Sequence, residues 1–270
     1  MSLMGLTVHD FWRLAAEPFI PLFGVLTPEN IALQPILNNF FFPETFVYSL
    51  RAEFGKLVPE RKDNAYANHD EPRFSIPLGD ESCAPWVCFR LSEISIYQNH
   101  VLGASSQTPG KDFPKDGSVA FIKLMRLEDS QSLRGELEMY KMLAEAQLGN
   151  TLRAPRLLGL VRDESGWVFG LLLTYMHSKS VTLSHAVKPE TSSPLRQKWA
   201  AQLRSIIYQL HKARLVWEDA EPEEFLIDMN QDAWIVDFGG GYTEGWVPKL
   251  AGTMEGYQHA LEKTVGFTGI

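Results

Sequence analysis

The sequence is poor in cysteine and contains no long hydrophobic run. Its two cysteines, Cys83 and Cys88, have no accompanying set of cysteines and histidines, so a disulfide framework is excluded and a zinc site is disfavoured. No stretch reaches 18 apolar residues, and the N-terminus lacks the basic-then-apolar pattern of a signal peptide. We therefore expect a cytoplasmic protein, with reduced cysteines and no membrane association.

Positive charge is also scarce, since the formal net charge of the 270 residues is −8. Non-specific binding to phosphates needs clustered lysine and arginine, so we expect no DNA-binding role. One local basic patch remains a candidate, at residues 51–62. With 45% hydrophobic residues, the chain can bury one core or two lobes that share a cleft.

The most informative stretch covers residues 210–241. Two short apolar runs, residues 225–227 and 233–236, are joined by a turn-type connection and predict a β-hairpin. Asp219 lies six residues before the first run, and Asp237 directly follows the second. Two strands that carry carboxylates to one edge of a cleft can hold a divalent cation between them.

This stretch resembles the protein-kinase fold. Asp237-Phe238-Gly239 matches the metal-binding motif, and Trp217-Glu218-Asp219 stands where the catalytic-loop His-Arg-Asp is found. The longer run at residues 232–247 looks like a group of kinase-like proteins from filamentous fungi. The resemblance implies an α+β, two-lobed protein-kinase-like fold, here with a truncated helical C-terminal lobe because only 29 residues follow Gly241.

Further elements match this resemblance. Residues 118–124 form an apolar run with one lysine, Lys123, which takes the position of the phosphate-contacting lysine. Glu136, in a predicted helix at 132–149, aligns with the glutamate that pairs with this lysine, and Glu138 is the fallback. Further strands are predicted at residues 89–97, 156–161 and 167–175, and a helix at 194–211. The strand at 167–175 would end in a hinge near Tyr175.

These elements divide the chain into three predicted parts. Residues 1–84 would be an N-terminal extension packed on the fold, and residues 85–176 an N-terminal lobe with a sheet and one helix. Residues 177–270 would form a reduced C-terminal lobe that contains the catalytic-loop hairpin. A segment at 253–263 could form one more helix.

The chain also departs from the kinase pattern. Glu221 replaces the loop lysine, and Glu224 replaces the metal-binding asparagine, which changes the formal charge of the site by −3. Residues 218–224 then carry five carboxylates. Two like charges about 6 Å apart repel by roughly 3 kcal/mol at an effective dielectric near 20. The glycine-rich phosphate-covering loop is absent, and Tyr257 replaces an aspartate of the fungal relatives.

An acidic loop of this kind suits a cation, because guanidinium and ammonium groups donate charge-assisted hydrogen bonds to carboxylates. Clustered carboxylates also raise one another's pKa, so that one of them can act as a general acid or base. We assign catalytic roles to four residues: Asp219, Glu221, Glu224 and Lys123. Substrate-binding roles are assigned to Glu218, Glu223, Asp237, Glu136 and Tyr175. Asp237 and Glu224 would be the metal ligands if magnesium binds.

Three functions follow as alternatives. The first is an enzyme that binds a cationic, arginine-like substrate or an aminoacyl-tRNA, such as a fungal arginine-containing cyclodipeptide synthase. That hypothesis rests on the fungal character, the acidic loop and the short chain, and the net charge counts against tRNA. The second is a divergent ATP-dependent phosphotransferase, the only alternative that needs Mg-ATP as cofactor. The third is a pseudokinase that binds without chemistry. Retention of Lys123, Glu136, Asp219 and Asp237 favours an active enzyme.

Overall fold

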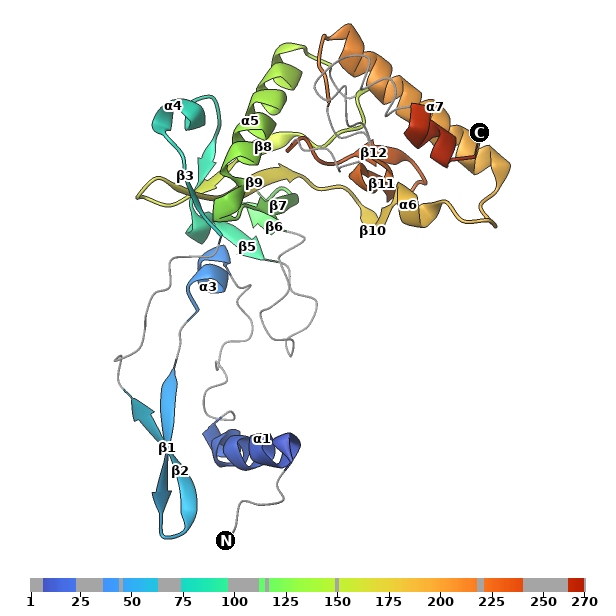
Figure 1. The fold of residues 1–270 in the computed structure, drawn as a ribbon. Coiled ribbons are helices and arrows are strands. Elements are labelled where there is room, and N and C mark those ends of the chain that lie inside the picture. The colour runs from blue at the N-terminus through green and yellow to red at the C-terminus, as the bar shows by residue number, and fades with distance from the viewer. Residues whose placement is uncertain are drawn as a thin grey trace.

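The computed structural model has a mixed α+β fold, and the residues that it describes form three β-sheets and a smaller number of helices (Figure 1). It describes residues 7–22, 36–43, 46–62, 74–96, 112–114, 117–148, 151–217, 221–239 and 262–269. In these residues no helix is long and apolar enough to cross a membrane. The predicted site residues Glu218 and Asp219 and the replaced position Tyr257 lie outside the described residues, as does most of the helix predicted at 253–263. A helix is found at residues 262–267.

The largest sheet has seven strands and is built around β9 (Trp167–Thr174). Six of the eight residues of β9 are buried, as its nearly continuous apolar run predicts. The strands follow the order β4-β8-β9-β7-β6-β5, and β3 also pairs with β9. Their bounds are Ile76–Pro77 (β3), Cys88–Phe89 (β4), Ile94–Ile96 (β5), Asp112–Pro114 (β6), Ala120–Leu124 (β7) and Leu157–Arg162 (β8).

The strand predicted at residues 89–97 is wrong as a single element. A short 3-10 helix, η2 (Leu91–Glu93), separates β4 from β5. The side chain of Glu93 accepts a hydrogen bond from the Arg90 backbone N–H over 2.9 Å, which closes this turn. The apolar residues keep alternating loosely with polar ones through η2, so the sequence pattern does not show that the strand is interrupted there.

Helices cover both faces of the large sheet. Helix α5 (Ser130–Glu145) lies on one face, and its buried apolar side chains belong to a cluster that continues into α7 and the strands that follow. Helix α3 (Leu37–Phe41) lies on the opposite face, where Leu37 is fully buried and Phe41 contacts Phe169 of β9 at 4.8 Å between ring centroids. The apolar side chains of α3 thus cover the outer face of the sheet.

A second, three-stranded sheet follows in the order β10-β11-β12. The hairpin β11 (Phe225–Asp228) and β12 (Ala233–Ile235) has the predicted antiparallel pairing, and β10 (Ser178–Thr182) adds to β11. Helix α7 (Ser193–Lys212) begins with proline in its first turn and buries one apolar stripe, as predicted. Its Trp199 indole N–H donates to the carbonyl of Gln231, which ties the helix to the hairpin turn. The short helix α6 (Leu183–Ala186) connects β10 to α7.

Figure 1 shows α1 and the hairpin β1–β2 lying away from the large sheet. Helix α1 (Val8–Ala16) begins with a capping box between Thr7 and Asp10, and the 3-10 helix η1 (Glu17–Phe19) continues it. Strands β1 (Val47–Glu53) and β2 (Lys56–Lys62) pair antiparallel, a hairpin that the sequence analysis did not predict. We refer to residues 7–22 and 46–62 together as the N-terminal module.

The candidate basic patch at residues 51–62 lies on this hairpin, and acids interrupt it. Arg51 forms an ion pair with Glu53, and Lys62 pairs with Glu60 at 3.0 Å. Arg61 lies over the ring of Phe46 at 4.7 Å from its centroid. These basic side chains therefore do not present a continuous positive surface to a polyanion.

The remaining helices are short. The 3-10 helices η3 (Leu127–Asp129) and η5 (Pro222–Glu224) precede α5 and β11, and α4 (Asp80–Cys83) follows β3. Cys83 is buried and Cys88 is exposed, and both are free thiols. Neither cysteine is part of a disulfide, as the count predicts.

Candidate functional site

The register of β11 and β12 brings acidic residues to one end of the hairpin. Phe225 pairs with Ile235, and the backbone N–H of Val236 donates to the carbonyl of Glu224 over 3.1 Å. Glu224 directly precedes β11, and Asp237 follows the end of β12. Because the strands are antiparallel, both residues lie at the same end of the hairpin. The two predicted metal ligands lie at the same edge, as expected for carboxylates carried by adjacent strands.

Lys123 of β7 lies between two carboxylates. Its Nζ is 2.8 Å from Glu136 Oε2 on α5 and 2.7 Å from Asp237 Oδ1. Glu136 is fully buried, whereas the side chains of Lys123 and Asp237 are 24% and 39% exposed. We call these three residues the ionic cluster. It joins the large sheet, α5 and the segment after the hairpin, which are separate in sequence.

Burial and charge act in opposite directions on the ionic cluster. Burial lowers the pKa of Lys123, but the facing carboxylates of Glu136 and Asp237 raise it above its ordinary value, so the lysine stays protonated. Burial raises the pKa of Glu136 to about 7, although Lys123 opposes the shift. Glu136 thus takes up a proton near neutral pH, and its protonation would remove one of the two negative partners of Lys123.

Hydrogen bonds fix the backbone around Asp237. The indole N–H of Trp217 donates to the carbonyl of Asp237 at 2.7 Å, and the N–H of Gly239 donates to Asp237 Oδ1 at 2.6 Å. Ser132 Oγ donates to the carbonyl of Gly239 at 2.7 Å. A Cβ on Gly239 would lie 2.6 Å from Ser132 Oγ, so this close approach requires glycine.

Phe238, between these two residues, is buried under α5. Its ring meets that of Tyr140 edge to face, with centroids 5.3 Å apart. Burial raises the pKa of the Tyr140 hydroxyl well above its ordinary value, with Glu136 and Asp237 adding to the shift. Phe238 therefore connects the position of α5, which carries Glu136, to the position of Asp237.

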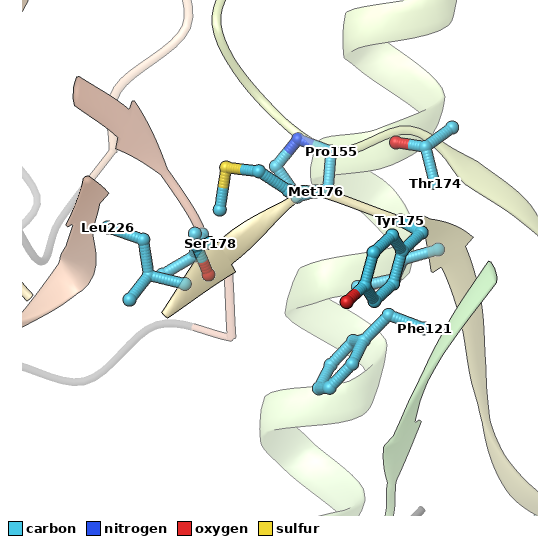
Figure 2. Close-up of a pocket in the computed structure, with 9 residues that line it drawn as sticks. Phe121, Pro155, Thr174, Tyr175, Met176, Ser178 and Leu226 are labelled. Carbon is cyan, nitrogen blue, oxygen red and sulfur yellow. The ribbon is translucent and has the colours of Figure 1, made fainter. Parts of the chain in front are cut away.

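An apolar pocket is lined by residues that neighbour the ionic cluster in sequence (Figure 2). It encloses about 640 Å³ of empty space, including the part open to solvent. The pocket is connected to the ionic cluster by sequence, because Phe121 precedes Lys123 on β7 and Val236 directly precedes Asp237. The lining residues come from β7, from the end of β9 and the segment after it, and from the β11–β12 hairpin: Phe121, Pro155, Leu173, Thr174, Tyr175, Met176, Ser178, Leu226 and Val236.

The acidic loop is described from Glu221 onward. Glu221 is buried with 9% exposure, and its backbone carbonyl accepts from the Glu224 N–H at 3.0 Å. Glu223 is exposed and Glu224 is half-buried on the same 3-10 turn. No group of three or more metal-ligating side chains occurs in the part of the chain that the structure describes. A divalent cation here would need ligands from its substrate as well as from the protein.

The structure thus brings Lys123, Glu136 and Asp237 into contact and places Tyr175 in the adjoining pocket. It does not bring Glu223 into the ionic cluster, because this side chain points to solvent. Sequence reasoning missed Phe121 as a pocket residue and Ser132 and Trp217 as residues that position the backbone near Asp237. The spacing of Phe121 from Lys123 places both side chains on one face of the strand, but it does not show that a pocket lies there.

Comparison with known proteins gives a partial match. No family model matches the chain. Over 131 residues, 46% of this chain, it is 27% identical to the Arabidopsis thaliana protein leaf rust 10 disease-resistance locus receptor-like protein kinase-like 1.2. The chain spans only 19% of that protein's length. The match indicates a distant kinase-like relationship. It carries no information on the fungal proteins or the cyclodipeptide synthases, which stay predictions.

Proposed function

We propose that this chain has a two-lobed, kinase-like cleft that binds a nucleoside triphosphate, and that it is a divergent ATP-dependent phosphotransferase. The observation that carries the proposal is the position of Lys123, which bonds to both Glu136 and Asp237 beside an apolar pocket. An apolar slot adjoining a fixed ammonium group complements a ligand with an aromatic base and an anionic tail. The partial similarity to a receptor-like kinase supports the same function.

In this proposal the base occupies the pocket and the phosphates reach Lys123. The buried carboxylate of Glu136 holds the ammonium group in place, so that little side-chain entropy is lost when the ligand binds. Trp217 and Ser132 keep the backbone of Asp237 and Gly239 in position. Asp219, the predicted base for the acceptor hydroxyl, lies outside the described residues, and its role rests on the resemblance alone.

Magnesium would bind at the end of the hairpin, held by Asp237 and Glu224. Carboxylate oxygens are its preferred protein ligands, and one or two of them suffice when substrate phosphates complete the shell. The ion would supply positive charge next to the phosphates. Because Glu221 and Glu224 replace a lysine and an asparagine of the kinase pattern, we expect phosphoryl transfer to be slow.

Isothermal titration calorimetry with ATP and Mg²⁺ tests the binding. Lys123→Met should weaken ATP binding by about tenfold or more, since charge-assisted hydrogen bonds to the phosphates are lost. Lys141→Met is the matched control, because Lys141 is an exposed lysine on the surface of α5. Failure of the wild-type protein to bind ATP would contradict the proposal.

Turnover is measured separately, as ATP consumption by the wild-type protein and by Asp219→Asn. We expect a slow activity that the substitution abolishes, because the acceptor proton then has no base. ATP binding without any turnover in the wild-type protein would contradict the transfer step and support the nucleotide-binding pseudokinase instead.

A second candidate function is favoured by the buried position of Glu221. A carboxylate with 9% exposure on a turn that also carries Glu223 and Glu224 would receive a guanidinium group better than a phosphate. Under this alternative the substrate is arginine-like, and an arginyl-tRNA-dependent cyclodipeptide synthase is its most specific form. Mg-ATP would then not be a cofactor.

The double variant Glu221→Lys with Glu224→Asn separates the two functions. If the protein binds an arginine-like substrate, the double variant should bind ATP more tightly and lose the binding of arginine and arginyl-tRNA, which calorimetry measures directly. If the protein is a phosphotransferase, the double variant should also bind ATP more tightly, but the wild-type protein should bind neither arginyl ligand. An unchanged ATP affinity in the double variant would show that these two glutamates do not face the phosphates.

A further inference from the structure

Phe121 is an aromatic side chain on the less buried face of β7. Its neighbours on β7, Ala120 and Ile122, are fully buried, whereas Phe121 is 38% exposed. Side chains two apart on a strand leave the same face, so Phe121 and Lys123 point to the same side of the sheet. An aromatic ring therefore stands on the same wall of the cleft as the ammonium group of the ionic cluster.

The opposite wall of the pocket comes from the hairpin. Figure 2 shows Leu226 across the pocket from Phe121, with Met176 and Pro155 along one side and the Tyr175 ring next to Phe121. Leu226 and Val236 are held in place by the pairing of β11 with β12 and by the backbone bond from Val236 to Glu224. The pocket thus has an aromatic wall on the sheet and an aliphatic wall on the hairpin.

We infer that Phe121 stacks on the base of the bound nucleotide and makes the base a large contributor to affinity. This inference rests on the proposed function, because it concerns the same cleft. A base whose one face lies on Phe121 and whose other face lies on Leu226 leaves its edge toward the segment after β9. Its sugar and phosphates then extend along β7 to Lys123, two residues further along the strand.

The stacking role has a consequence for specificity. Every base has a π-face, so a stacking wall contributes to the binding of any purine and discriminates little between adenine and guanine. A larger ring covers more of Phe121 than a smaller one, and we expect purine triphosphates to bind more tightly than pyrimidine triphosphates. Inorganic tripolyphosphate, which has no ring, should bind through Lys123 only.

Calorimetric titration of ATP and of inorganic tripolyphosphate tests the inference. The wild-type protein should bind ATP more tightly than tripolyphosphate. Phe121→Ala should weaken ATP binding by about tenfold, within the range measured for aromatic–base stacking, and leave tripolyphosphate unchanged. Phe121→Leu keeps most of the apolar volume without the ring and should also lose affinity, whereas Phe121→Tyr should retain it. Phe54→Ala, at a fully exposed phenylalanine on the β1–β2 turn, is the matched control.

Each other outcome overturns the inference. Tighter ATP binding by Phe121→Ala would show that the ring obstructs the pocket, and full retention by Phe121→Leu would reduce its role to apolar filling. Unchanged ATP binding by Phe121→Ala would show that Phe121 does not contribute to binding the base, although the protein still binds the nucleotide. Equal wild-type affinity for ATP and tripolyphosphate would mean that no base is bound. Wild-type protein that binds neither ligand would end the proposed function together with the inference. Circular dichroism and thermal unfolding of each variant establish that the fold is kept.

Discussion

Glu136 is a fully buried carboxylate whose charge depends on pH in the neutral range. Its pKa in the folded protein is about 7, above the ordinary value of 4.5, because burial disfavours the ionised form. The folded state therefore binds a proton between these two values that the unfolded state releases. The stability from this group is fully present below about pH 4.5 and is lost as the pH rises through 7.

Glu136→Gln should remove this dependence. From pH 5 to pH 8, the free energy of unfolding of the wild-type protein should fall by up to about 3 kcal/mol more than that of the variant. Urea denaturation at a series of pH values measures the difference. Glu138→Gln, an exposed glutamate on the same helix, is the control and should follow the wild-type profile. Parallel profiles for the wild-type protein and Glu136→Gln would mean that Glu136 stays ionised throughout.

Individual residues of the site differ in how far the sequence predicts them. Lys123 and Glu136 could be predicted because a lysine inside an apolar strand needs an anion, and the next helix offers one at a matching position. Phe121 could not be assigned to the pocket, since a strand pattern gives the face of a side chain but not what lies opposite. Trp217 and Ser132 act through hydrogen bonds to residues 20 and 107 positions away in sequence, which no local pattern contains.

At the scale of elements, the two hairpins show why one was predicted and the other was missed. The β11–β12 turn joins two apolar runs through residues 229–232, three of which are polar. The β1–β2 turn has Phe54 and Gly55 at its tip, both with positive φ, of +48° and +78°. Asparagine or aspartate usually precedes glycine at such a turn. Because phenylalanine stands there instead, the sequence lacks the residue pair that would predict a hairpin.

Helix α3 has only five residues, yet it covers the outer face of the large sheet. Leu37 is fully buried in the cluster that includes Ile122, Phe169 and Leu172, whereas Leu57 of β2 is 37% exposed. A short helix of this kind has no stability of its own, so the packing of its side chains must hold it in place.

Leu37→Ala should therefore lower the free energy of unfolding by about 2–4 kcal/mol, the cost of a cavity in a closed core. Leu57→Ala should lower it by less than about 1 kcal/mol, because little apolar area is removed from contact. Chemical denaturation of both variants checks the prediction. If Leu37→Ala were no more destabilising than Leu57→Ala, α3 would not be docked on the sheet in solution.

Across the whole molecule, residues packed into buried hydrophobic clusters differ from the N-terminal module, which lies outside these clusters. One buried cluster runs from the large sheet through α5 and α7 to the β11–β12 hairpin and includes Phe238. A second lies between the sheet and α3. Among the side chains that the structure describes, none from the N-terminal module, residues 7–22 and 46–62, belongs to either cluster, and the module exposes Val8, Trp12, Leu14, Ile20 and Phe54. Site residues and sheet thus belong to one cooperative core, and the module packs separately.

This difference predicts two levels of local stability, which hydrogen exchange can measure. A two-stranded hairpin and a nine-residue helix are each marginal in water, so the amides of β1, β2 and α1 should exchange through local opening at low free energy. The amides of β8, β9 and α7 should exchange only through unfolding of the core, more slowly by several orders of magnitude. Exchange followed by mass spectrometry in low urea separates the two classes, because only core amides should show a strong dependence on urea. Equal protection and equal urea dependence would place the N-terminal module in the same cooperative unit as the ionic cluster.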